Sequence, residues 1–100
     1  MVQATTPTFV LTLPNDIDLG EAAHVYFTLR QKGTMIEKQD AELTIDENEV
    51  SVYLSQEETL ALAVGAALIQ LNWTYENGAR ACSNIVSIKV SENLLKEVVE

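Results

Sequence analysis

The chain has 100 residues, of which 47% are hydrophobic; this suits one self-standing domain and excludes a disordered chain. Its 6 basic and 15 acidic residues give a net charge of -9, which repels nucleic acid and anionic membrane surfaces. We expect this charge to serve solubility and to protect sheet edges, with attraction of a basic protein partner as the alternative.

The expected domain spans residues 1–100, with an ordered core over about 8–91 and a tail over 92–100. Residues 1–7 carry no basic segment followed by an apolar one, so no secretory leader is expected. The most apolar run, 60–71, is shorter than the roughly 20 residues that cross a bilayer. We therefore expect synthesis in a reducing cytoplasm and no membrane partner.

Apolar and polar residues alternate along most of the chain, with the period of two that indicates β-strands. The first strand is expected over 8–13, where a proline stops it, and a polar loop follows over 15–21. The loop is expected to turn Ile17 and Leu19 onto the core. A second strand over 24–31 alternates cleanly, and a turn then leads to a short strand over 34–38.

A hairpin and the one helical signal follow. Strands over 42–46 and 49–54 flank a turn in which Asn48 is expected to take a left-handed conformation. Ser55, followed three residues later by Glu58, matches a helix capping box, in which each side chain bonds the other residue's backbone amide. We expect one short helix that continues over 59–63 and ends at Gly65, crossing one end of the fold.

The last hairpin is expected to join strands over 66–75 and 79–90 through a type I′ turn at Asn77-Gly78. Counting from that turn sets three pairs of residues opposite each other: Trp73 with Cys82, Ile69 with Val86, and Leu71 with Asn84. The first two pairs suit the inward face. The third is a poor core pair, so we expect a β-bulge within 83–85.

About seven strands spaced about ten residues apart, with one short helix, predict an all-β, immunoglobulin-like antiparallel β-sandwich. The tail is amphipathic and is either frayed or docked through Leu94, Leu95 and Val98. The side chains expected in the core are Phe9, Leu11, Val25, Phe27, Leu29, Val52, Leu54, Ile69, Leu71, Trp73, Val86 and Ile88.

Catalytic and metal-binding chemistry is not expected. His24 is the one histidine and has no nucleophile signature around it, and Cys82, the one cysteine, is expected to be buried against Trp73. Two such residues fall short of the four ligands of a structural zinc site. The acidic clusters lack the glycine-punctuated order of a calcium loop; they are Asp16 with Asp18 and Glu21, and Asp40 with Glu42, Asp46 and Glu47. We expect no catalytic residue, no metal and no cofactor.

Four residues are candidate contacts for a protein partner: Tyr26, Arg30, Tyr53 and Glu57. Both tyrosines fall opposite the apolar residues of their strands, so they are expected to be exposed, and exposed tyrosines are good contact residues. A partner surface is favoured if the two tyrosines lie together on one sheet.

Several segments resemble small phage baseplate and tail accessory domains, including the N-terminal domain of upper baseplate proteins. The segment 54–60 resembles their L-(S/T)-Q-E-E-T-L stretch. The other similar segments are Phe9 to Leu13, Asp18-Leu19, Val25 to Gln31, Ile69 to Trp73 and Asn77-Gly78, with Ser83 beyond. The resemblance covers roughly 8–91. Upper baseplate proteins continue into a helical region and a receptor-binding attachment, so host adhesion is not carried over to these 100 residues.

The resemblance implies a structural or assembly protein of a phage or prophage particle, made in the host cytoplasm and then part of the virion. Its partners would be other virion proteins or a second copy, and the sequence leaves the oligomeric state open. The alternative is a β-sandwich that binds a small ligand or glycan through exposed aromatic residues. An enzyme is the third reading, which a cleft holding His24 beside an acidic residue would favour.

Overall fold

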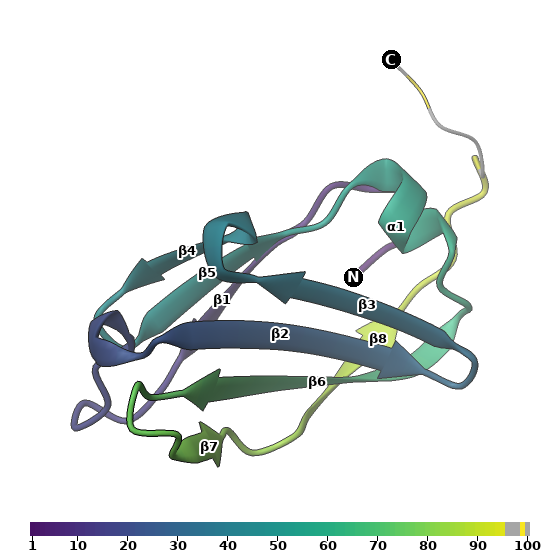
Figure 1. The fold of residues 1–100 in the computed structure, drawn as a ribbon. Helices are drawn as coiled ribbons and strands as arrows, with labels where there is room; N and C mark the ends of the chain where they lie inside the picture. Colours follow the sequence, from purple (N-terminus) through teal and green to yellow (C-terminus); the bar gives the residue numbers. More distant parts are fainter. Residues whose placement is uncertain (96–98, 100) are drawn as a thin grey trace.

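Two antiparallel sheets face each other in this protein (Figure 1). The computed structural model describes residues 1–95 and 99, and these contain eight strands. The first sheet has the order β1-β5-β4, and the second has the order β3-β2-β6-β7, with β8 also paired to β6. The strands are β1 (Thr8–Thr12), β2 (His24–Gln31), β3 (Thr34–Gln39), β4 (Leu43–Asp46), β5 (Glu49–Tyr53), β6 (Gly65–Thr74), β7 (Arg80–Cys82) and β8 (Val86–Val90).

The order of the strands is that of an immunoglobulin-like sandwich. With β1 as strand B, the sheets become B-E-D and C′-C-F-G, in which β7 and β8 share the role of strand G. The described residues contain no strand beside β1 in the place of strand A. Residues near the N-terminus instead run parallel to the end of β8, through a bridge between Val2 and Ser91. The predicted all-β sandwich is therefore confirmed.

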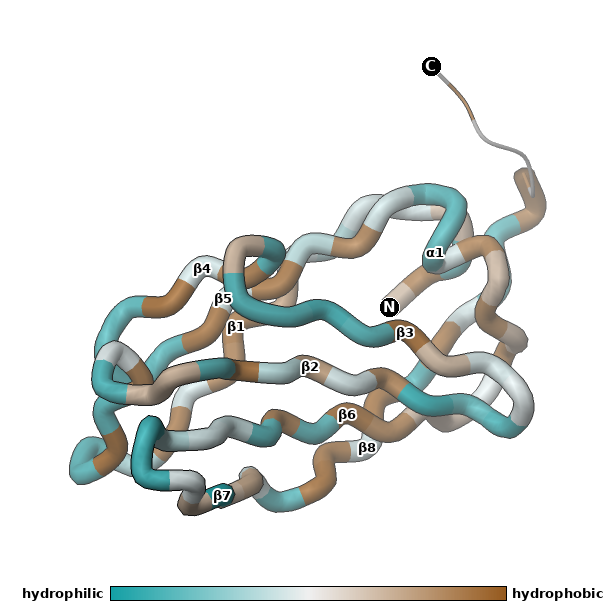
Figure 2. The backbone as a smooth tube through the Cα atoms, in the orientation of Figure 1, coloured by the Kyte–Doolittle hydropathy of each residue, from teal (hydrophilic) through white to brown (hydrophobic). Residues whose placement is uncertain are grey.

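Strand alternation places the core as the sequence indicates. Figure 2 shows hydrophobic and hydrophilic residues alternating along β2 and β6, while β3 is mostly hydrophilic. Phe9, Leu11 and Ile88 are partly buried and pack against the core. The predicted core residues that are fully inside are Val25, Phe27, Leu29, Val52, Leu54, Ile69, Leu71 and Trp73. Leu19 is buried and Ile17 packs against the core, as expected of their loop.

The expected seventh strand is two strands, because a bulge divides it. In β7, Cys82 lies opposite Asn72, whereas in β8, Val86 lies opposite Ile69, so β7 and β8 differ in register by one residue. Ser83 lies where the register changes. Its amide donates to the carbonyl of Leu71 (2.9 Å), and its hydroxyl accepts from the Leu71 amide (2.9 Å). The predicted bulge and the pairing of Ile69 with Val86 are confirmed.

The predicted pairing of Trp73 with Cys82 is wrong, because the turn has a different length. Tyr75 pairs with Ala79 across a three-residue loop, and Gly78 takes the left-handed conformation (φ 87°). The resulting register sets Trp73 opposite Ala81. A slip of one residue turns a side chain to the other face of a strand. Cys82 is therefore exposed and does not lie in the core.

As expected, the bulge prevents the poor pairing of Leu71 with Asn84, because Leu71 bonds to Ser83. Val86 was expected in the core, and 48% of its surface is exposed. It sits at the start of β8, just beyond the bulge, in an edge strand of the wider sheet. The narrower sheet ends at β1 and leaves this side chain uncovered.

The turn between β4 and β5 uses a different residue from the one predicted. Glu47 takes the left-handed conformation (φ 55°), in place of Asn48. The Asn48 side chain instead donates hydrogen bonds to the carbonyl of Leu13 and to the side chain of Asn15 (3.2 Å). Asn48 thus ties the hairpin to the end of β1.

The predicted capping box is confirmed at helix α1 (Gln56–Leu60). The Ser55 hydroxyl accepts from the Glu58 amide (3.2 Å), and the Glu58 carboxylate accepts from the Ser55 amide (2.9 Å). The helix ends at Leu60 and does not reach Ala63 or Gly65. The buried side chain of Gln31 holds the amide and the carbonyl of Ala63, both at 2.7 Å, which replaces the helical partners of that residue.

The tail does not dock through its leucines. Leu94 is 92% exposed and Leu95 is also exposed, while Val98 lies outside the described residues. Polar contacts hold this part of the chain: the Asn93 side chain donates to the carbonyl of Gln3 (3.0 Å).

Gly65 begins β6 with φ 130°, a conformation that side chains disfavour, although a Cβ there would meet nothing within 4 Å. We expect Gly65→Ala to lower the free energy of unfolding by about 1–3 kcal/mol through backbone strain alone. Gly33 is the matched control, because it has equal space and no such φ. Urea unfolding should show Gly33→Ala unchanged or slightly more stable. Equal losses in both variants would contradict the explanation by strain.

Candidate functional site

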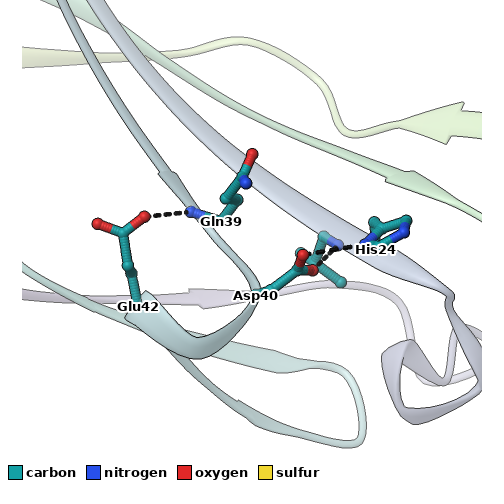
Figure 3. A network of polar contacts seen from close by, with 5 residues as sticks. His24, Gln39, Asp40 and Glu42 are labelled. Atoms are coloured by element: carbon teal, nitrogen blue, oxygen red, sulfur yellow. Dashed lines mark hydrogen bonds and ion pairs between the residues drawn. The ribbon is translucent and has the colours of Figure 1, made fainter.

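His24 and Asp40 lie side by side where β2 begins (Figure 3). The Nδ1 atom of His24 is 2.9 Å from the Oδ2 atom of Asp40, and the other carboxylate oxygen accepts from the Val25 amide (3.1 Å). Asp40 reaches both groups from the short 3-10 helix η2 (Asp40–Glu42), which it enters with φ 50°. The Glu42 carboxylate accepts from the Gln39 amide (3.2 Å) at the same corner.

Hydrogen bonds at this corner favour the charged form of the Asp40 carboxylate. The hydrogen bond from His24, followed by the one from the Val25 amide, lowers the pKa of Asp40 below its usual value. An imidazole held by a carboxylate is also the orienting half of a catalytic triad. Here the His24 side chain is 57% exposed and the Asp40 side chain 40% exposed, and neither lines any of the three hollows of the surface. The geometry supports a structural role, in which Asp40 joins the start of β2 to η2 through its contacts with His24 and Val25.

A second pair of charges joins α1 to the edge strand β3. The Lys38 ammonium lies 2.9 Å from the Glu58 carboxylate, and both side chains are partly shielded. Burial alone would raise the pKa of Glu58, but the Ser55 amide and the Lys38 ammonium outweigh burial and leave this pKa below its usual value.

A lowered pKa in the folded state stabilises the fold above the unfolded-state pKa, and that stability is lost as the pH falls through the folded pKa. We therefore expect acid to weaken the α1 contact below about pH 4.5, near the ordinary glutamate pKa. Glu58→Gln should remove part of this acid dependence in urea titrations at successive pH values. Glu57→Gln, which changes the net charge equally on the exposed side of α1, is the control. An equal effect in both variants would contradict the role of the Lys38 pair.

Carboxylates of the two acidic clusters accept hydrogen bonds from backbone amides near them. Across residues 1–95 and 99, no group of three or more His, Cys, Asp or Glu side chains is placed to hold a metal ion. Asp18 accepts from the Gly20 amide (2.9 Å) and thereby caps the 3-10 helix η1 (Leu19–Glu21). Asp40 and Glu42 fix the corner of η2.

The four predicted contact residues do not form one surface. Tyr26 and Arg30 point outward from β2 in the five-stranded sheet. Tyr53 points outward from β5 in the three-stranded sheet, and Glu57 is exposed on α1. The two tyrosines therefore lie on opposite outer faces, and the condition for a shared tyrosine surface is not met.

The outer face of the five-stranded sheet carries two adjoining hollows, which Thr28 joins. The first has a volume of about 360 Å³ and is lined mostly by polar residues, so we call it the polar hollow. Arg80 donates to the side chain of Asn72 within it (3.0 Å). The residues whose side chains turn outward here are Tyr26, Thr28, Glu37, Gln39, Asn72, Thr74 and Arg80.

The second hollow, of about 150 Å³, is more apolar. Met35 on β3 and Ile85 in the bulge border it, with 54% and 57% of their surfaces exposed. Leu68 lies between them and pairs with Arg30 across β2 and β6. We call the surface formed by the two hollows the outer sheet face. Sequence reasoning identified Tyr26 and Arg30 on this face but missed Met35, Leu68 and Ile85.

In the part of the chain that the structure describes, no helix is long and apolar enough to span a membrane. Comparison of the sequence and the structure with protein-family models, curated proteins and solved structures finds no match.

Proposed function

We propose that this domain is a non-catalytic structural or assembly module of a phage or prophage particle, and that it docks against other virion proteins through the outer sheet face. The particle is suggested by the resemblance of residues 8–91 to baseplate accessory domains. The docking surface is suggested by one observation: Met35 and Ile85 are more than half exposed on the same face, around Leu68 and Arg30.

The chemistry of this face suits a protein partner. Exposed apolar side chains that gather on one side of a domain mark interaction surfaces, whereas scattered ones do not. Tyrosine and arginine are enriched among the residues that carry binding energy, and here Tyr26 and Arg30 extend from the same strand. The polar hollow beside them supplies amide, carboxylate and guanidinium groups that can fix the orientation of the partner.

The test is co-assembly with purified tail and baseplate proteins. Met35→Glu places a charge in the docking face, and Tyr53→Glu places the same charge on the other sheet at the same 54% exposure. We expect Met35→Glu to weaken co-assembly at least about tenfold and Tyr53→Glu to leave it unchanged. Failure of the natural chain to join any component counts against the proposal. Loss in the Tyr53 variant alone would move the contact to the other sheet.

The polar hollow supports a second candidate function, binding of a glycan or another small polar ligand. Its volume of about 360 Å³ falls in the range of ligand pockets, and Tyr26 lies beside Glu37, Asn72 and Arg80. A glycan array tests this reading: a reproducible hit that Tyr26→Ala removes would favour it over protein docking. An array without such a hit would favour protein docking.

A further inference from the structure

Strand β1 has one free edge. It pairs with β5 alone among the strands of the described chain. The amide of Leu13 donates to the carbonyl of Asn48 (2.8 Å), and the amide of Leu54 donates to the carbonyl of Pro7 (3.1 Å). Since bonding alternates along an antiparallel ladder, the odd-numbered residues of β1 bond to β5. The amides and carbonyls of Thr8, Val10 and Thr12 therefore lie in the plane of the sheet and point away from β5, toward the open edge.

The free edge lacks the features that usually protect such strands. Residues 8–12 contain no charged residue and no proline, and their pairing with β5 is continuous, without a bulge. Val10 in the middle is 58% exposed. Edges of this kind accept a further strand, because the outward amides and carbonyls gain partners by pairing.

An apolar groove lies beside this edge. Its volume is about 360 Å³, and it runs between β1 and the segment where the bulge separates β7 from β8. None of the residues that line it is charged, although 21% of the chain is. Its apolar lining includes Leu11, Leu13, Ile17, Leu71, Trp73 and Val86.

The edge and the groove together occupy the place of the strand that immunoglobulin-like sheets add beside strand B. Residues at the N-terminus do not fill this place. Gln3 donates its amide to the carbonyl of Ser91 (3.0 Å), and Ser91 donates to the carbonyl of Met1 (2.7 Å), so this segment follows the end of β8. The position next to β1 stays open, with Leu11, Ile17 and Val86 partly exposed beside it and Leu71 and Trp73 buried beneath it.

We propose that this groove receives an extended segment of a partner protein, which adds beside β1 as a fourth strand of the β1-β5-β4 sheet. The outward amides and carbonyls of Thr8, Val10 and Thr12 require an extended backbone in the partner. Because strand side chains alternate, every second residue of the segment enters the groove, and the uncharged lining selects apolar residues there.

Charge bears on one end of the segment. Asp16 lies between two lining residues of the groove, and Glu49 pairs with Thr12 at the end of β1. With a net charge of -9 on the whole chain, a basic residue of the segment is attracted to this end of the edge. The occupant is therefore an extended segment of a partner protein, with alternating apolar residues and a basic residue where it passes Thr12. This proposal does not rest on docking at the outer sheet face, so either proposal can fail alone.

A synthetic peptide of about ten residues, with alternating valine and threonine and a lysine pair at each end, is a suitable probe. Trp73 lines the groove and is the one tryptophan of the chain, so its fluorescence reports occupancy. We expect saturable binding, together with slower amide hydrogen exchange at Thr8, Val10 and Thr12. The same peptide with alternate backbone amides methylated should bind at least about tenfold more weakly.

Two variants separate the edge from the groove. Val10→Pro removes an outward amide and leaves the bonds to β5 intact, whereas Val10→Thr keeps that amide. Val86→Asp places a charge at the exposed lip of the groove. We expect Val10→Pro and Val86→Asp to weaken peptide binding at least about tenfold and Val10→Thr to preserve it.

Three results would overturn the proposal. The first is no saturable binding up to about 1 mM peptide. The second is binding that is indifferent to Val10→Pro and to methylation of the peptide. The third is protection of the β1 amides that rises with protein concentration in the absence of peptide, because the occupant would then be a second copy of this chain.

Discussion

Replacing Phe27 with alanine is expected to lower the free energy of unfolding by about 3–5 kcal/mol. Phe27 lies in the middle of β2, none of its surface is exposed, and its neighbours across the ladder are Leu71 and Lys38. Removing a large ring from such a position takes away apolar burial and leaves a cavity that the sheets on both sides cannot close. Urea unfolding followed by circular dichroism measures the loss.

Two variants make this test sharp. Phe27→Leu keeps most of the volume and should cost less than about 1.5 kcal/mol, so it stays measurable even if the alanine variant does not fold. Tyr26→Ala, on the neighbouring outward-facing residue of the same strand, should change stability little. A loss from Tyr26→Ala as large as that from Phe27→Ala would contradict the assignment of inner and outer faces.

The elements that the sequence predicts well depend on neighbouring residues. Alternation along 24–31 identifies both faces of β2, because an antiparallel strand with one buried and one solvent-exposed face shows this pattern in its own sequence. The capping box at Ser55 and Glu58 is likewise complete within four consecutive residues. The end of α1 is different, because Gln31, far away in the sequence, takes the backbone of Ala63 out of the helix.

The last hairpin shows how a local ambiguity becomes a structural error. Asn-Gly is compatible with a two-residue turn and with a longer loop that has glycine in the left-handed position. The protein uses the longer loop, so β7 shifts by one residue and Cys82 turns outward. The bulge at Ser83 then shifts the register back, which is why the prediction for Ile69 and Val86 holds. The longer loop and the bulge each shift the register by one residue, in opposite directions, and counting residues from the turn detects neither shift.

The candidate surfaces were harder to predict, because they depend on which strands become neighbours. Met35, Leu68 and Ile85 meet on the outer sheet face although they come from distant parts of the chain. Tyr26 and Tyr53 each follow the pattern of an exposed residue, yet their sheets lie on opposite sides of the core. The free edge of β1 likewise follows from topology, since β1 itself resembles any alternating strand.

The two proposed contacts use different strands and adjoin at the bulge, where Ile69 and Gln70 line both. One uses the outer face of the five-stranded sheet, and the other uses the edge of the three-stranded sheet. A domain with a flat docking face and a strand-accepting edge is suited to joining two neighbours in an assembly. This geometry supports a structural role better than it supports a role in ligand capture alone.

Replacing Trp73 with alanine is the second change expected to destabilise the fold strongly, by about 3–5 kcal/mol. Trp73 is buried on β6 between Val25 and Ala81, and its indole nitrogen donates to the Tyr75 hydroxyl (3.0 Å). The indole therefore contributes both apolar burial and one satisfied polar group. Urea unfolding followed by far-ultraviolet circular dichroism measures the effect without relying on tryptophan emission.

A double-mutant cycle separates the two contributions of Trp73. Trp73→Phe keeps a ring in the core and loses the donor, while Tyr75→Phe removes only the hydroxyl that accepts. Each should cost on the order of 1 kcal/mol, and the double variant should cost less than the two together, because both changes break the same bond. Strict additivity would mean that the bond contributes nothing. A small loss in Trp73→Ala would mean that the two sheets close over the vacated space, contrary to the close packing on which the expected loss depends.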